Sequence, residues 1–197
     1  MEQLTPEEIQ VDLDMTSFNI TVVGRFNRHI LEPEWARKRS IISPEPCLAF
    51  LPIGGVQPIF RTSSGLCWLL QDDKLLIFGN RSEAPVFLKS VLTELPHTPV
   101  TAIGVNFQSS KNVKAKLDVR AKTLSKALEK PLLQASEGRT YQLSDGVKLN
   151  LKVTWSAGQR TLDTNFHRDT IDPVVVCKHA QNLDEFEQMA KELEDKL

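Results

Sequence analysis

Three short apolar runs separated by tight polar breaks fill residues 57–80 of the chain. The runs are QPIFRTS (57–63), GLCWLLQ (65–71) and KLLIFGN (74–80). Runs of this length are typical of strands, and the breaks Ser63-Ser64-Gly65 and Gln71-Asp72-Asp73 are typical of hairpin turns. The pattern therefore predicts an antiparallel meander.

Further strands are predicted on both sides of this meander. SFNITVVGRF (17–26) and TPVTAIGVNFQ (98–108) are rich in β-branched residues, which favour strands. Residues 139–167 give three more candidates, RTYQLS, VKLNLKVTW and TLDTNFH, with glycine-containing turns between them. The segment 112–130 fits either a strand followed by a helix or one continuous helix.

Two amphipathic helices are predicted from apolar side chains at helical spacing. The first covers 85–95 and opens at Ser82-Glu83-Ala84-Pro85, and the second covers 182–197 with Asn182 as its N-cap. A third, short helical turn is predicted at 33–39, with Pro33 in its first position. The predicted fold class is α+β: a mainly antiparallel sheet with two or three amphipathic helices on one side.

One sequence pattern occurs twice, at 75–95 and at 174–194: a short apolar run, a polar connection and an amphipathic helix. It predicts two pseudo-repeated strand–helix halves, with VVVC (174–177) as the strand of the second copy. The predicted organisation is an acidic N-terminal arm (1–16), a strand-rich half (17–108), a basic connecting segment (109–138) and a second strand-rich half (139–197). One continuous domain is the alternative.

Composition and charge exclude several classes of protein. The 197 residues carry a formal net charge of −1, so no global field attracts polyanions. The three cysteines are too few and too scattered for a disulfide scaffold or a zinc finger. The start of the chain lacks the apolar region of a secretory signal, and no apolar run is long enough for a membrane span. A cytoplasmic protein without cofactor or membrane contact is expected.

Basic residues gather in two segments that are candidate contacts for nucleic acid or for a protein partner. The candidate contact residues are Arg25, Arg28, Trp35, Arg37, Lys38 and Arg39 in the first segment, and Lys114, Lys116 and Arg120 in the second. The alternative is that both segments are ordinary solvated surface, because lysine is expected there and also protects sheet edges.

Two further sets of side chains are candidates for chemistry. Asp163, His167 and Asp169 share one face of a predicted strand and predict a metal site or an acid–base histidine. Cys177 and His179 would also share a face of a strand, as in a nucleophilic dyad or half a metal site. The alternatives are a polar strand face and a buried cysteine.

The sequence contains no GxSxG, P-loop, HExxH or dinucleotide-binding glycine signature. The leading hypothesis is a non-enzymatic binding or assembly protein that acts through a protein partner, as a homodimer. A nucleic-acid-binding protein and a metal-assisted hydrolase built on Asp163, His167 and Asp169 are the alternatives.

Overall fold

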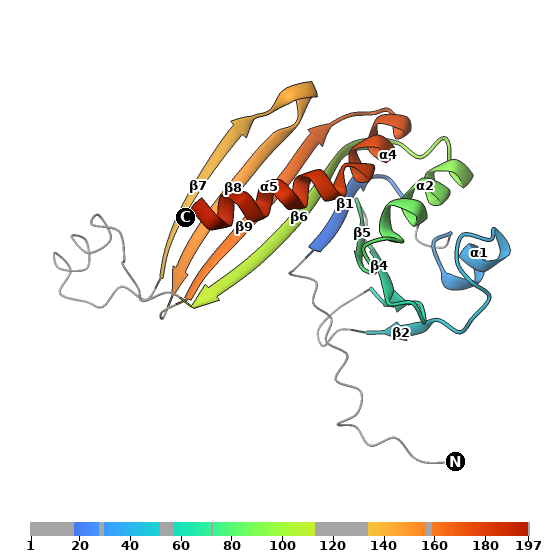
Figure 1. The fold of residues 1–197 in the computed structure, drawn as a ribbon. Helices are drawn as coiled ribbons and strands as arrows, with labels where there is room; N and C mark the ends of the chain where they lie inside the picture. The colour runs from blue at the N-terminus through green and yellow to red at the C-terminus, as the bar shows by residue number, and fades with distance from the viewer. Residues whose placement is uncertain are drawn as a thin grey trace, which may run out of the picture.

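The computed structural model describes residues 18–27, 30–51, 57–71, 73–112, 134–156 and 159–196. These residues form one nine-stranded antiparallel sheet in the order β2-β3-β4-β5-β1-β6-β9-β8-β7 (Figure 1). The strands are β1 (Phe18–Gly24), β2 (Leu48–Phe50), β3 (Ile59–Arg61), β4 (Leu66–Leu70), β5 (Lys74–Gly79), β6 (Val100–Asn112), β7 (Gln134–Gln142), β8 (Lys148–Ser156) and β9 (Gln159–Asp169). The predicted α+β class and the meander β3-β4-β5 are confirmed.

The strand order divides the sheet into two halves with the same connectivity. In each half a first strand, β1 or β6, is followed by a meander whose last strand, β5 or β9, returns to pair with the first strand. A helix follows that last strand in each half. β1 and β6 pair with each other in the middle, so the two halves form one continuous sheet.

The helices in the described residues are α1 (Pro33–Lys38), α2 (Ala84–Glu94), α4 (Pro173–Gln181) and α5 (Leu183–Lys196). Helices α2, α4 and α5 lie on the same face of the sheet (Figure 1). Within the part of the chain that is described, no helix is long and apolar enough to cross a membrane.

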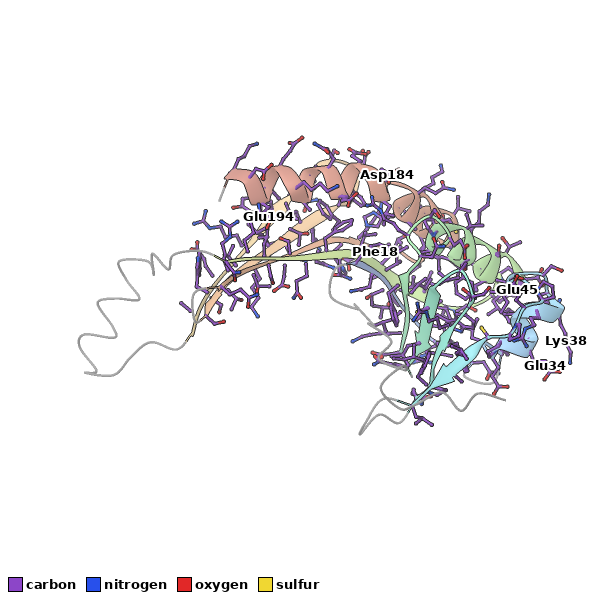
Figure 2. All side chains as sticks on the ribbon, turned by 60° about the horizontal axis from the view of Figure 1, so that its bottom comes forward. Phe18, Glu34, Lys38, Glu45, Asp184 and Glu194 are labelled. Carbon is purple, nitrogen blue, oxygen red and sulfur yellow. The ribbon has the colours of Figure 1, made fainter. Side chains whose placement is uncertain are left out.

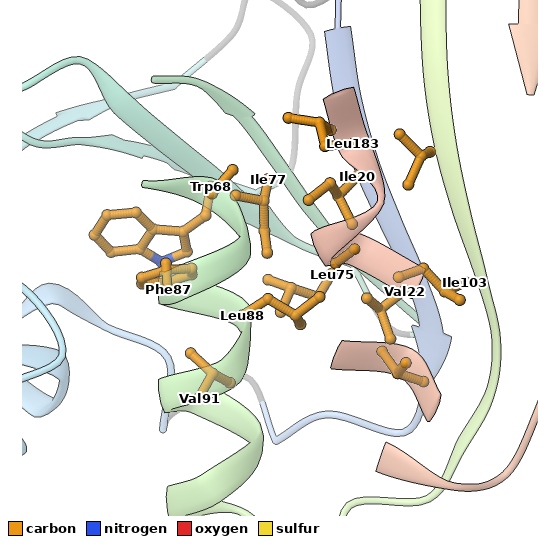
Figure 3. Packing of buried hydrophobic residues seen from close by; sticks show 14 of the residues in the cluster. Ile20, Val22, Trp68, Leu75, Ile77, Phe87, Leu88, Val91, Ile103 and Leu183 are labelled. Carbon is orange, nitrogen blue, oxygen red and sulfur yellow. The ribbon is translucent and has the colours of Figure 1, made fainter. Parts of the chain in front are cut away.

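The core lies between the sheet and these helices and extends through both halves (Figure 3). Trp68 on β4 has no exposed surface and packs between the rings of Phe60 and Phe87. Its indole N–H donates to the carbonyl of Leu31 at 2.9 Å, which fixes the segment before α1 against the sheet. In the second half Phe166 and Phe186 stack with their ring centroids 4.5 Å apart.

One predicted element is wrong: residues 174–177 form part of helix α4 and not a strand. Asp172 is the N-cap, and its carboxylate accepts a hydrogen bond from the backbone N–H of Val174 at 2.8 Å. Pro173 occupies the first turn, where its missing N–H is not needed. This N-terminal cap and the burial of Val176 outweigh the strand preference of three consecutive valines.

The face of the sheet opposite the helices is concave, because β2, β3 and β4 turn away from the plane of β6, β8 and β9 (Figure 2). In the first half this face is apolar: Ile59, Cys67, Leu69 and Phe78 form a buried cluster. In the second half the same face is polar, as described next.

Candidate functional site

Every second side chain of β6, β8 and β9 points to the open face, opposite the helices. Along β9 the buried residues 160, 162, 164 and 166 alternate with residues that are partly exposed. The residues that are partly exposed on β9 are polar: Thr161, Asp163, Asn165 and His167. Strand alternation therefore separates a core side from a polar surface in this half.

An asparagine ladder runs across five strands of the open face. The antiparallel registers place Asn19, Asn106, Asn165, Asn150 and Thr140 side by side on β1, β6, β9, β8 and β7. Directly opposite side chains in a sheet are close enough to interact. These five residues are called the amide ladder below.

Hydrogen bonds connect the amide ladder from one side to the other. Asn106 Nδ2 donates to Asn19 Oδ1 at 2.8 Å, and Asn165 Nδ2 donates to Asn106 Oδ1 at 2.5 Å. Asn150 Nδ2 donates to Asn165 Oδ1 at 3.0 Å, and the hydroxyl of Thr140 donates to Asn150 Oδ1 at 2.9 Å. A connected set of this kind holds each carboxamide in one orientation.

Gly104 lets the ladder lie close to the backbone of β6. A Cβ at Gly104 would be 2.6 Å from Asn165 Nδ2, closer than real Cβ contacts allow. A Cβ at position 104 would push the Asn165 carboxamide away from the position in which it bonds to Asn106 and Asn150.

Charged groups of both signs flank the ladder. On one side Asp163 accepts a hydrogen bond from Gln108 and lies opposite Lys152. On the other side Asp169 contacts Lys148 at 2.7 Å and His167 at 2.9 Å. The hydrogen bonds from Lys148 and His167 lower the pKa of the Asp169 carboxyl, so this group is ionised at neutral pH.

The open face is hollowed over the ladder. The hollow has a volume of about 570 Å³, and all five ladder residues line it. Its rim includes Gln108, Lys152 and Asp163. The site therefore offers many fixed amide groups and few charges, which suits binding by hydrogen bonds.

The predicted metal residues share a strand face but do not converge. Asp163 lies four positions before His167 on an extended strand, which is about 13 Å. His167 and Asp169 are in contact, yet no group of three His, Cys, Asp or Glu that could hold a metal occurs among the described residues. The structure thus brings two of the three residues together, and Asp169 also forms an ion pair with Lys148.

Arg37 and Lys38 lie on α1 and Arg39 follows it directly. Lys38 is at the opposite end of the molecule from Glu194 of α5 (Figure 2). Lys38 pairs with Glu34, Arg39 pairs with Glu94, and Arg37 donates to the carbonyl of Glu45. Trp35 is partly buried and packs against the core. Pairing with acidic and carbonyl groups reduces the positive field of this segment.

The remaining predicted contact residues add little support for a binding surface. Arg25 is exposed beyond the end of β1, and its backbone N–H donates to the carbonyl of Pro99. Arg28, Lys114, Lys116 and Arg120 lie outside the described residues. The nucleic-acid hypothesis thus stays a prediction.

The predicted Cys177–His179 pair does not form. On helix α4, residues two apart point to different sides, and the interpretation as a strand was the source of the error. Burial raises the pKa of the Cys177 thiol, which keeps it protonated and weakly nucleophilic. His179 is 1% exposed and bonds to the Phe166 carbonyl at 2.8 Å, and burial lowers the pKa of its imidazole.

Sequence reasoning missed the ladder, although a signal was present. Asparagine is depleted in strands, yet Asn19, Asn106, Asn150 and Asn165 all lie inside segments that were predicted as strands. The alignment of Asn19, Asn106 and Asn165 depends on the registers of strands far apart in the chain, which the sequence pattern does not supply.

Comparison with known proteins gives no relative: the chain matches no protein-family model, no curated protein and no solved structure.

Proposed function

We propose that the protein is a non-enzymatic binding protein that holds an extended segment of a partner polypeptide against the concave open face. The observation that carries the proposal is the amide ladder across the hollow of about 570 Å³. Catalysis of an unfamiliar kind is not part of the proposal.

Hydrogen-bonding capacity is the first support for a polypeptide ligand. A carboxamide has two N–H donors and an oxygen with two lone pairs. Within the described residues, the ladder uses one N–H and one lone pair of Asn165, and the same of Asn150. Each of these two amides therefore retains one donor and one acceptor, the same pair of groups that a peptide unit offers.

Charge is the second support. Lys148 and Lys152 on the open face are matched by Asp163 and Asp169. A phosphate backbone requires a surplus of basic groups, which this part of the face does not have. A polypeptide with side chains of both signs fits the alternation better.

Preorganisation is the third support. The ladder amides are fixed by one another before a ligand arrives, and they project from strands of a single sheet and not from loops. A surface that is already ordered loses less conformational entropy on binding.

The test uses a random peptide library and, in parallel, single- and double-stranded DNA and RNA. The full chain is compared with the double variant Asn150→Ala/Asn165→Ala, and the control is Thr154→Ala/Thr161→Ala, which changes the same face outside the ladder. Selected peptides are expected to bind the double variant about tenfold or more weakly, because two hydrogen bonds are lost. The control should bind as the wild type does.

Two results would overturn the proposal. One is salt-sensitive binding of nucleic acid through the open face without binding of peptides, which would favour the alternative hypothesis. The other is equal loss of affinity in the ladder variant and the control. Thermal unfolding of both variants shows whether a loss of binding comes from a loss of fold.

A further inference from the structure

The outer edge of β7 is a second surface with a defined chemistry. β7 pairs with β8 over nine residues without a shift of register, and no described strand lies on its other side. Residues 136–142 are all exposed. Such an edge presents backbone N–H and C=O groups that can pair with another strand.

β7 lacks several of the usual protections of a free edge, and its two charged side chains, Glu137 and Arg139, have opposite signs. Residues 134–142, QASEGRTYQ, contain no proline and no lysine, and the strand has no bulge. The edge at β2 differs because that strand has only three residues. β7 is therefore the edge at which a strand can be added.

The sequence of β7 is self-complementary about its central residue, Gly138. In an antiparallel pair of two β7 strands centred on Gly138, Glu137 lies opposite Arg139 of the second copy, and Arg139 lies opposite the second copy's Glu137. Opposite residues in such a pair are about 5 Å apart between Cβ atoms, within reach of an ion pair. The two-fold axis produces each pair twice.

Other registers are worse. Centring the pair on Glu137 or on Arg139 places two like charges opposite each other, which destabilises a pair of strands. Centring it between two residues turns the helices of the two copies to opposite faces, because neighbouring residues point to opposite sides. Gly138 is thus the centre that matches charge and keeps both helix layers on one face.

An apolar hollow beside β7 also fits a second copy. It has a volume of about 260 Å³ and is lined in part by Tyr141, Val153, Trp155 and Leu193. Tyr141 is 41% exposed. In the register centred on Gly138, the second copy's Tyr141 comes opposite Ala135, whose neighbour on β8 is Trp155. The short side chain of Ala135 leaves room for the two rings to meet.

We propose that two copies of this chain associate through β7, in an antiparallel pair centred on Gly138, so that both sheets join into one. Within one chain Arg139 already pairs with Glu137 at 2.7 Å. In the dimer the two carboxylates and two guanidinium groups form one cluster of alternating charge, and the contact of Tyr141 with Trp155 adds to it. This association concerns the edge of the sheet and does not depend on what the open face binds.

The first experiment is a charge exchange on the full chain, with molar mass measured by sedimentation over a range of concentrations. The wild type is expected to shift from monomer to dimer. Glu137→Arg or Arg139→Glu alone sets like charges opposite each other and should weaken the dimer about tenfold or more. An equimolar mixture of the two variants, or the double exchange in one chain, restores opposite charges and should restore the dimer.

The matched control is Lys38→Glu, a charge reversal in an exposed ion pair on α1. It should leave the dimer unchanged, and circular dichroism of all variants shows whether they are folded. A wild type that stays monomeric at all concentrations overturns the proposal. A dimer that is insensitive to the exchange, or one that the mixture does not restore, does the same because it must use another surface.

The second experiment tests the register. In Gly138→Cys, the two new thiols face each other on the two-fold axis and should form a disulfide-linked dimer under mild oxidation. In Thr140→Cys, each new thiol lies opposite Ser136 of the second copy and should crosslink far less. The wild type, whose Cys47, Cys67 and Cys177 are half-buried or buried, is the control for crosslinks through native thiols. Equal crosslinking at 138 and 140 contradicts the register.

Discussion

The two halves of the sheet share one connectivity but use their open faces differently. Asn19 on β1 marks the boundary: its neighbour on β5 is Phe78, and its neighbour on β6 is Asn106. On the Phe78 side the open face is a buried apolar cluster, whereas on the Asn106 side it is the polar amide ladder. The first half therefore contributes to stability from both faces, and the second half keeps one face for binding.

The largest expected effect tests this boundary directly. Phe78 is 1% exposed on the open side of β5, so Phe78→Ala should lower the free energy of unfolding by about 3–5 kcal/mol. Asn106→Ala, in the same row of the sheet, removes only hydrogen bonds between partly exposed groups and should cost about 1 kcal/mol. Urea unfolding of both variants measures the difference. Equal losses would show that the two halves use their open faces alike.

Acid should lower the stability of the protein through His179, which is buried between the helices and the sheet in the second half. Burial lowers the pKa of His179 below its ordinary value of 6.5, and the neighbouring Arg168 and His167 act in the same direction. Near pH 6.5 the His179 imidazole therefore takes up a proton in the unfolded chain but not in the folded chain. It follows that the free energy of unfolding decreases as the pH falls below about 6.5, by about 1.4 kcal/mol for each unit of depression.

Urea unfolding at a series of pH values between neutral and mildly acidic measures this loss. His179→Gln should flatten the dependence on pH, and His97→Gln, at an exposed histidine, should retain it. A wild type whose stability is constant through this range would show that His179 is protonated as easily in the folded chain as in the unfolded one.

The sequence predicts local elements better than the placement of one element beside another. The meander at 57–80, helix α2 and the strands of 139–167 follow from periodicity and turn residues, and the structure confirms them. The strand predicted for residues 174–177 was wrong because the N-cap Asp172 and the first-turn Pro173 favour a helix there. In the ladder, Thr140, Asn150 and Asn165 come from the consecutive strands β7, β8 and β9. Asn106 and Asn19 join them only through registers between strands distant in the chain.

The smallest effect separates the ladder from the sheet that carries it. Gly104→Ala places a Cβ 2.6 Å from Asn165 Nδ2, so the Asn165 amide must leave its bonds to Asn106 and Asn150. The expected loss is about 1–2 kcal/mol in the free energy of unfolding.

Gly138→Ala is the control: its Cβ would be 3.8 Å from the nearest atom, and alanine should stabilise the strand by about 0.5 kcal/mol. If Gly104→Ala is as well tolerated as Gly138→Ala, and the side-chain amide resonances of Asn165 do not move, the ladder is not fixed as described. If the loss is found and peptide binding falls with it, the polar open face of the second half is ordered for binding, unlike the apolar face of the first.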